Sequence, residues 1–263
     1  MKNDTPNFRT SLAISDESSI TVLGKNMATE LLGKIAFGEL AFWLMRLRRP
    51  SPNELRLFEA VLLATAEHGL TTSSISARLT YHSAPEALQG ALAAGILNGG
   101  SRFLGVTENV ARMLANAVEQ LQAHPQSDEG WDEVARAVIS AYPKGEPIPG
   151  IGHPMFKNGD PRVPVLIRIA QEEGLTGPHL ALLLGIARVL KEKLGRELPL
   201  NGAGVNGAIL ADMGFPVKIV RGISLLARTA GLLGHLAEEQ RNPIANDIYR
   251  SIEDRVDYTP PPA

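Results

Sequence analysis

The sequence has no cysteine among its 263 residues. This absence excludes a disulfide framework, a thiolate nucleophile and cysteine-ligated zinc or iron–sulfur centres. We expect no metal site and no tightly bound cofactor. Aromatic residues are scarce as well, at 5% of the chain, whereas glycine occurs 25 times. This combination favours close packing of helices over a β-sandwich.

Neither sign of charge is in excess, because 26 Lys and Arg residues face 28 Asp and Glu residues, for a net charge of −2. A basic surface for nucleic acid or anionic lipid is therefore not expected. No apolar run is long enough to span a bilayer. The opening residues, MKNDTPNFRT, lack the apolar stretch of a secretory signal. These features predict a soluble, cytoplasmic globular protein.

Helical periodicity dominates the chain, and the expected fold class is mainly all-α with a short N-terminal β-hairpin. Two short apolar runs within residues 10–22 surround a Ser-Asp-Glu-Ser turn and predict the hairpin. The spacing of apolar residues predicts helices from there to the C-terminal region. Their expected ranges are 25–49, 53–68, 72–81, 84–98, 104–124, 127–142, 160–174, 178–196, 203–213, 216–239 and 243–254.

The helical pattern is interrupted at residues 142–152, where YPKGEPIPGIG holds three prolines and three glycines. Such a segment cannot continue a helix and is typical of a loop that carries function. We expect a large helical domain formed by residues 1–144 and 215–263. Residues 145–214 are expected to form a small helical domain.

One string after this break combines several chemical groups. His153 follows the glycines of PGIG, Lys157 comes four residues later, and Arg162 stands in the first turn of the next helix. Glycines let a ligand approach the backbone, histidine transfers protons near neutral pH, and a helix N-terminus favours anions. The alternative is a capped loop with surface charges, and the string alone leaves both interpretations open.

A second set of polar residues lies on the last long helix and at the end of an early one. Arg221, Arg228 and His235 are seven residues apart and share a helix face. A buried Arg there would serve either an anionic ligand or a Glu of a neighbouring helix. His68 ends a helix, where a cation is a common structural feature. The remaining histidines (82, 124 and 179) are expected to be capping or surface residues.

Five strings, in order along the chain, together resemble the citrate synthase superfamily. Residues 149–162, PGIGHPMFKNGDPR, resemble its PG-aromatic-GH…K/R…DPR signature. Residues 66–78 and 225–240 resemble its (A/S)DHE junction and its R-x-x-G-x-x-x-H helix. Residues 10–33 resemble its N-terminal strands and first helix. Residues 95–114, GILNGGSRFLGVTENVARML, are similar to the GDRFGG region of citryl-CoA lyases and of the lyase module of ATP citrate lyase.

The resemblance implies two all-α domains with an active site in the cleft between them. It implies His153 as the residue that hydrogen-bonds the substrate hydroxyl or carbonyl and moves its proton. His68, Arg162 and Arg228 would bind carboxylates, with His68 counted among the catalytic residues. Lys157 would contact coenzyme A phosphates, and the loop Gly150, Ile151 and Gly152 would lie along the coenzyme A ester.

Two positions depart from the citrate synthase pattern. Phe103 stands where synthases have a histidine that polarises the thioester, as in the lyase-type relatives, and we expect it to line the substrate site. Ala203 stands where the family has its catalytic aspartate. A methyl group cannot move a proton, and losing such a base commonly costs about 10²–10⁴-fold in rate. Asp212, nine residues further on, would point to the opposite side of the helix and is a poor substitute.

The resemblance therefore predicts a citryl-CoA lyase-like enzyme. Its substrate would be citryl-CoA or a related 3-hydroxy-3-carboxyacyl-CoA. The alternatives are a citrate or 2-methylcitrate synthase and a catalytically impaired acyl-CoA-binding homologue. A homodimer or higher homo-oligomer is expected, with a coenzyme A ester and a di- or tricarboxylate as the small-molecule partners.

Overall fold

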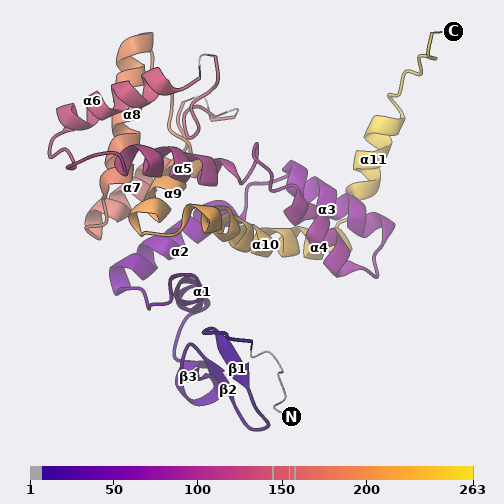
Figure 1. Cartoon of the computed structure of the whole chain (residues 1–263). Helices are drawn as coiled ribbons and strands as arrows, with labels where there is room; N and C mark the ends of the chain where they lie inside the picture. The colour runs from indigo at the N-terminus through magenta and orange to yellow at the C-terminus, as the bar shows by residue number, and fades with distance from the viewer. Residues whose placement is uncertain (1–7, 144, 154, 157, 263) are drawn as a thin grey trace, which may run out of the picture. The chain divides into compact units, whose positions relative to one another are not determined.

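The computed structural model describes residues 8–143, 145–153, 155–156 and 158–262, and they are mostly helical, as expected (Figure 1). The chain divides into two compact units, residues 1–59 and 60–263, which are described in turn. None of the helices within the described residues is both long and apolar enough to cross a membrane. The division into domains 1–144 with 215–263 and 145–214 stays a prediction.

A small antiparallel sheet opens the first unit and confirms the expected hairpin. Strand β1 (Ala13–Ser15) pairs with β2 (Ile20–Val22), which pairs with β3 (Lys25–Asn26). Asp16 closes the first turn by accepting hydrogen bonds from the amides of Ser18 and Ser19, both at 2.8 Å. These donors hold the pKa of the Asp16 carboxyl at about 2.

The single helix expected over residues 25–49 is wrong in its first half. Lys25 and Asn26 belong to β3, a π-helical turn follows at Met27–Leu31, and α1 covers only Phe37–Arg46. Gly24 adopts a φ of +76°, and this tight turn returns the chain alongside β2. Gly33, with a φ of +72°, separates the π turn from α1.

Helix α2 (Pro52–Ala66) leads into the second unit, where the expected helices are found with ends shifted by a few residues. They are α3 (Thr72–Ser83), α4 (Leu88–Leu97), α5 (Val106–Val118), α6 (Asp128–Ala141), α7 (Arg162–Glu172), α8 (Pro178–Leu194), α9 (Gly202–Asp212), α10 (Val217–Arg241) and α11 (Ala245–Glu253). Helix α10 packs against α3, α4 and α5, and α5 and α8 both pack against α9. Figure 1 shows α10 running from α5 and α9 at one end to α3 and α4 at the other.

Helix α9 is the central element of the second unit. Eight of its eleven residues are buried, and they form a continuous series from Gly204 to Leu210 together with Gly202. A helix that is apolar all round belongs in a core. Its N-terminus meets the loop before α7 through an isolated bridge between Ile151 and Leu200. The expected break at residues 142–152 is thus confirmed and lies against the start of α9.

Candidate active site

The C-terminal end of α2 binds two arginines that come from distant parts of the chain. The carbonyl oxygen of Ala64 accepts a hydrogen bond from Nη1 of Arg162 at 2.8 Å. The carbonyl oxygen of the next residue, Thr65, accepts one from Nη2 of Arg228 at 2.9 Å. The last carbonyls of a helix lack partners within the helix and carry partial negative charge. This helix end therefore brings the two cations to one place.

Asp160 orients Arg162. Its two carboxylate oxygens accept from Nε and Nη2 of Arg162 at 2.9 and 2.7 Å, and Oδ2 also accepts from the amide of Gly202 at 2.7 Å. Burial raises the pKa of Asp160, but these donors outweigh it and hold the pKa below its usual range. The role of Asp160 as the partner of Arg162 was not predicted from the sequence.

Gly202 lets the Arg162 guanidinium lie against the start of α9. A Cβ atom at this glycine would be 2.9 Å from the guanidinium carbon, closer than packed side chains allow. The sequence did not indicate this contact, because it joins residues 40 positions apart.

Arg228 is only 5% exposed on α10. Besides Thr65 it contacts the hydroxyl of Thr71 at 3.4 Å, and its buried Nε has no hydrogen-bond partner within the described residues. Burial lowers the pKa of the guanidinium, Glu67 raises it, and Arg162 lowers it. A buried guanidinium with donors to spare beside a second arginine is suited to bind an anion.

The two predicted histidines face each other beside these arginines. The ring centroids of His68 and His153 are 5.8 Å apart, and Phe156 packs 4.5 Å from His153 and 5.8 Å from His68. Burial lowers the pKa of His68, and the charges of Arg162, His153 and Arg228 lower it further. His68 is therefore neutral near pH 7 unless an anion binds beside it.

Hydrogen bonds to His153 define its tautomer. Its Nδ1 accepts from the amides of Met155 and Phe156, each at 3.1 Å. In the neutral ring the proton must then be on Nε2. Nε2 is therefore the donor atom of the neutral His153 ring.

The expected cofactor loop is tied to the start of α9. The amide of Gly152 donates to the carbonyl of Pro199 at 2.6 Å, and the side-chain amide of Asn201 donates to the carbonyl of Gly152 at 2.7 Å. Gly150 has a φ of +88°, and a Cβ on it would be 2.9 Å from Cα of Gly204. Only glycines permit this approach of two backbones. Lys157, the expected phosphate contact, lies outside the described residues.

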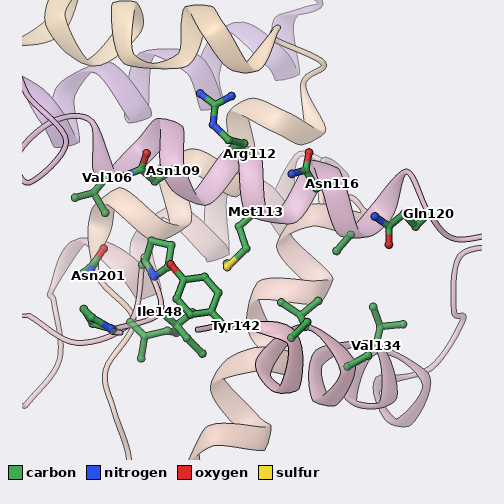
Figure 2. A pocket seen from close by; sticks show the side chains of 18 of the residues that line it. Val106, Asn109, Arg112, Met113, Asn116, Gln120, Val134, Tyr142, Ile148 and Asn201 are labelled. Atoms are coloured by element: carbon green, nitrogen blue, oxygen red, sulfur yellow. The ribbon is translucent and has the colours of Figure 1, made fainter. Parts of the chain in front are cut away.

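A large pocket of about 1240 Å³ opens beside this loop. Its walls are α5, α6 and the segment 147–151, and Gly150, Ile151 and Asn201 belong to its lining. Figure 2 shows Asn109 and Asn116 of α5 along one wall, with Tyr142 and Ile148 across from Met113. The pocket does not include the two histidines or the two arginines. It meets them at the loop that ends in His153.

The remaining expected residues lie around this centre. Phe103, 53% exposed, makes no ring contact with either histidine within the described residues, whereas its neighbours Ser101 and Arg102 line the pocket. Ala203 is half-buried in the first turn of α9, between the glycines that contact Arg162 and Gly150. Asp212, at the other end of α9, caps the start of α8: its carboxylate accepts hydrogen bonds from the amides of His179 and Leu180 at 2.9 and 3.0 Å.

Of the three α10 residues expected on one face, only Arg228 joins the arginine pair. Arg221 pairs with Glu108 at 2.8 Å, and His235 contacts Glu67 at 3.0 Å. The structure therefore brings His68, His153, Arg162 and Arg228 together and leaves Phe103 at the periphery.

Comparisons with solved structures identify lyases with the same architecture. The citryl-CoA lyase of Hydrogenobacter thermophilus superimposes with a TM-score of 0.83 at 26% identity, covering 97% of this chain and 96% of that one. The ATP citrate lyase of Methanothrix soehngenii, solved with citrate and coenzyme A, gives a TM-score of 0.78 at 24% identity. That match covers 98% of this chain and 42% of the other.

Sequence comparison leads to the same group of proteins. Citrate synthase 2 of Bacillus subtilis is 28% identical over 216 residues, which are 81% of this chain and 53% of that protein. The chain thus spans about half the length of this relative. The family model described as "Citrate synthase, C-terminal domain" matches residues 19–251. The chain belongs to the citrate synthase family.

Proposed function

We propose that this protein is a citryl-CoA lyase-like enzyme that cleaves citryl-CoA, or a related 3-hydroxy-3-carboxyacyl-CoA. The products would be acetyl-CoA and oxaloacetate, or a related 2-oxo acid. The observation that carries the proposal is the convergence of Arg162, Arg228, His68 and His153 at the end of α2. The full-length similarity to a citryl-CoA lyase supports the lyase direction.

The geometry suggests a role for each of these side chains. The substrate carboxylates would be bound by Arg162, whose guanidinium is oriented by two hydrogen bonds to Asp160, and by the buried Arg228. His68, neutral before binding, adds a hydrogen bond. His153 would donate a hydrogen bond from Nε2 to the oxygen that is a hydroxyl in the substrate and a carbonyl in the product.

The coenzyme A portion would occupy the pocket between α5 and α6. Its volume of about 1240 Å³ suits a ligand larger than most metabolites. The loop of Gly150, Ile151 and Gly152 would lie along the ligand, and Lys157 would meet a phosphate. Phe103 would border the thioester.

The proton balance of the cleavage identifies the weak point of the site. The substrate hydroxyl gives its proton to solvent, the bond between the carbinol carbon and the acetyl methylene breaks, and the electron pair forms the enolate of acetyl-CoA. That enolate must then gain a proton on carbon. Ala203 cannot donate it, and the Nε2–H tautomer of His153 opposes uptake of the hydroxyl proton. We therefore expect slow turnover.

The test compares the wild-type protein with Ala203→Asp and with Ala203→Asn, which matches Asp in shape but cannot exchange a proton. Purified proteins are incubated with citryl-CoA, and oxaloacetate and acetyl-CoA are quantified. We expect slow cleavage by the wild type and an increase of about 10²-fold or more in Ala203→Asp only. No cleavage by any of the three proteins would contradict the lyase proposal.

Ala203 also favours a second candidate, a coenzyme A ester-binding homologue without turnover. It predicts binding of citryl-CoA or acetyl-CoA, with no product formed even by Ala203→Asp. Citrate or 2-methylcitrate synthesis, the third alternative, predicts thiol release from acetyl-CoA or propionyl-CoA with oxaloacetate. The expected two-domain division, the homo-oligomer and the cytoplasmic location remain part of this proposal.

A further inference from the structure

Glu67 closes the turn that carries His68. Its Oε1 accepts three hydrogen bonds: from the amides of His68 and Gly69 at 2.9 and 2.6 Å, and from Nε2 of His235 at 3.0 Å. Burial raises the pKa of the Glu67 carboxyl, but the Gly69 amide and the His235 ring outweigh it and hold the pKa below its usual range. Glu67 therefore stays ionised and keeps all three donors.

His235 is itself held in one tautomer by a buried arginine. Nε and Nη2 of Arg78 approach its Nδ1 at 3.2 and 2.9 Å. A guanidinium can only donate, so Nδ1 of His235 must accept, and the ring proton must be on Nε2. That proton points to Glu67. The direction of the hydrogen bond from His235 to Glu67 is therefore set by Arg78.

Arg78 is 1% exposed and bound on the other side by two carboxylates of α10. Nη1 donates to Glu239 at 2.7 Å, and Nη2 pairs with Glu238. Glu239 in turn accepts from the amides of Ile244 and Ala245 at 3.0 and 2.9 Å, where α11 begins. A continuous chain of hydrogen bonds thus runs from α11 through α10 and α3 to the backbone of His68.

We propose that Glu67 and His235 are positioning residues for His68, acting through the backbone of the turn 67–69 rather than on the substrate. This inference rests on the proposed function only in that it takes His68 to be a ligand-binding side chain. The hydrogen bonds make the backbone of His68 the end of this network, although the Glu67 side chain is half exposed, and so keep the ring beside Arg162, His153 and Arg228 before a ligand arrives. Such preorganisation reduces the entropy lost on binding.

The pKa of His68 measures this positioning without any ligand. Arg162, His153 and Arg228 face the ring and lower its pKa, as burial does, and Asp160 acts in the opposite direction. Burial is the largest of these effects. If the turn 67–69 opens, water reaches the His68 ring, and the pKa of His68 rises towards its ordinary value of 6.5. Loss of the negative charge of Glu67, without any movement of the turn, would lower the pKa of His68 or leave it unchanged.

The experiment titrates His68 by NMR in the full-length protein, with a His68→Gln variant to assign the signal. In Glu67→Gln, the amide oxygen replaces Oε1 as acceptor, and we expect the His68 pKa to stay low or fall. In Glu67→Ala, the turn loses its acceptor and the pKa rises towards 6.5. Glu238→Gln, with the same loss of charge on the Arg78 network but no contact with the turn, leaves the pKa unchanged.

An equal shift in the same direction for Glu67→Ala and Glu67→Gln would overturn the proposal, because it would mean that only the charge matters. If Glu67→Ala does not fold, His235→Asn decides: a raised His68 pKa supports positioning and an unchanged one refutes it. Citryl-CoA cleavage by the wild type is measured separately. Its absence would reject the lyase function and leave the positioning of His68 standing.

Discussion

His68 is a residue of the site whose charge can vary near neutral pH. The guanidinium groups of Arg162 and Arg228 are permanently charged, and the carboxyl of Asp160 is held ionised by its hydrogen bonds. Burial and these two cations lower the pKa of His68. A bound carboxylate would reverse that effect, since a nearby negative charge favours the protonated ring.

Binding of a dicarboxylate should therefore be linked to proton uptake by His68. We expect the affinity for oxaloacetate to rise as the pH falls from 8 to 6, because the ring gains a proton more readily in the complex than in the free protein. Calorimetry in two buffers with different ionisation enthalpies measures the protons taken up. In His68→Asn this uptake should fall, because only the imidazole of His153 remains in the site. An affinity that is independent of pH in the wild type would contradict the assignment.

The same shift has a consequence for folding. Because the folded-state pKa of His68 lies below its unfolded value, this residue favours the folded state above about pH 6.5, and that contribution declines as the pH falls through the folded-state pKa.

At the scale of the elements, the site depends on two helix ends. The C-terminus of α2 binds both arginines through the carbonyls of Ala64 and Thr65. The N-terminus of α9, capped by Asn201, holds the loop 150–152 and supports Arg162. Both arrangements use backbone groups that every helix leaves unpaired at its ends. The geometry of the site therefore depends on how closely α9 approaches the loop.

Gly204→Ala tests this approach. A Cβ at Gly204 would lie 2.8 Å from both Cα and the carbonyl oxygen of Gly150, and backbone atoms there cannot move aside alone. We expect a loss of about 1–3 kcal/mol in the free energy of unfolding and weaker coenzyme A ester binding, measured by urea denaturation and calorimetry.

Gly222→Ala is the matched control, since nothing lies within 4 Å of a Cβ at this exposed position of α10. It should gain up to about 1 kcal/mol from helix propensity and bind normally. Equal effects of the two substitutions would show that the contact between Gly204 and Gly150 is unimportant.

At the scale of the whole molecule, the loop 149–153 of the second unit lines the pocket with Pro149, Gly150 and Ile151 and ends in His153, which faces His68. A ligand that occupies the pocket and also contacts the arginine pair would bridge α5, α6, α9 and the end of α2. Ligands that bind only the folded state stabilise it by mass action. Occupation should therefore stabilise the unit as a whole.

A coenzyme A ester at one hundred times its dissociation constant should raise the free energy of unfolding by about 2.7 kcal/mol. Differential scanning calorimetry with and without acetyl-CoA measures this gain. Ala137→Phe, which places a ring in the pocket from α6, should abolish the gain while leaving the ligand-free melting temperature within a few degrees. If acetyl-CoA stabilises Ala137→Phe as much as it stabilises the wild type, the ligand binds outside this pocket.

The helices were largely predictable from sequence, because apolar spacing and capping residues act locally. The start of α1 was not, since Lys25 and Asn26 pair with β2, and tertiary pairing outweighs their helical spacing. Among the site residues, His153 and Arg162 were predictable from the glycine-rich string. The contacts of Glu67 with His235 and of Asp160 with Gly202 were not recognised, because only folding brings these residues close.

The sequence by itself predicted that any chemistry uses histidine, arginine, lysine and backbone amides, because cysteine is absent and Ala203 carries no ionisable group. It also determined the helices and the glycine-rich loop, since both follow from local conformational preference. Only the tertiary structure decided that Arg162 and Arg228 share the end of α2, that Asp212 caps α8, and that His235 reaches the turn of His68. These contacts join residues up to 168 positions apart, and packing of the helices, rather than local preference, brings them together.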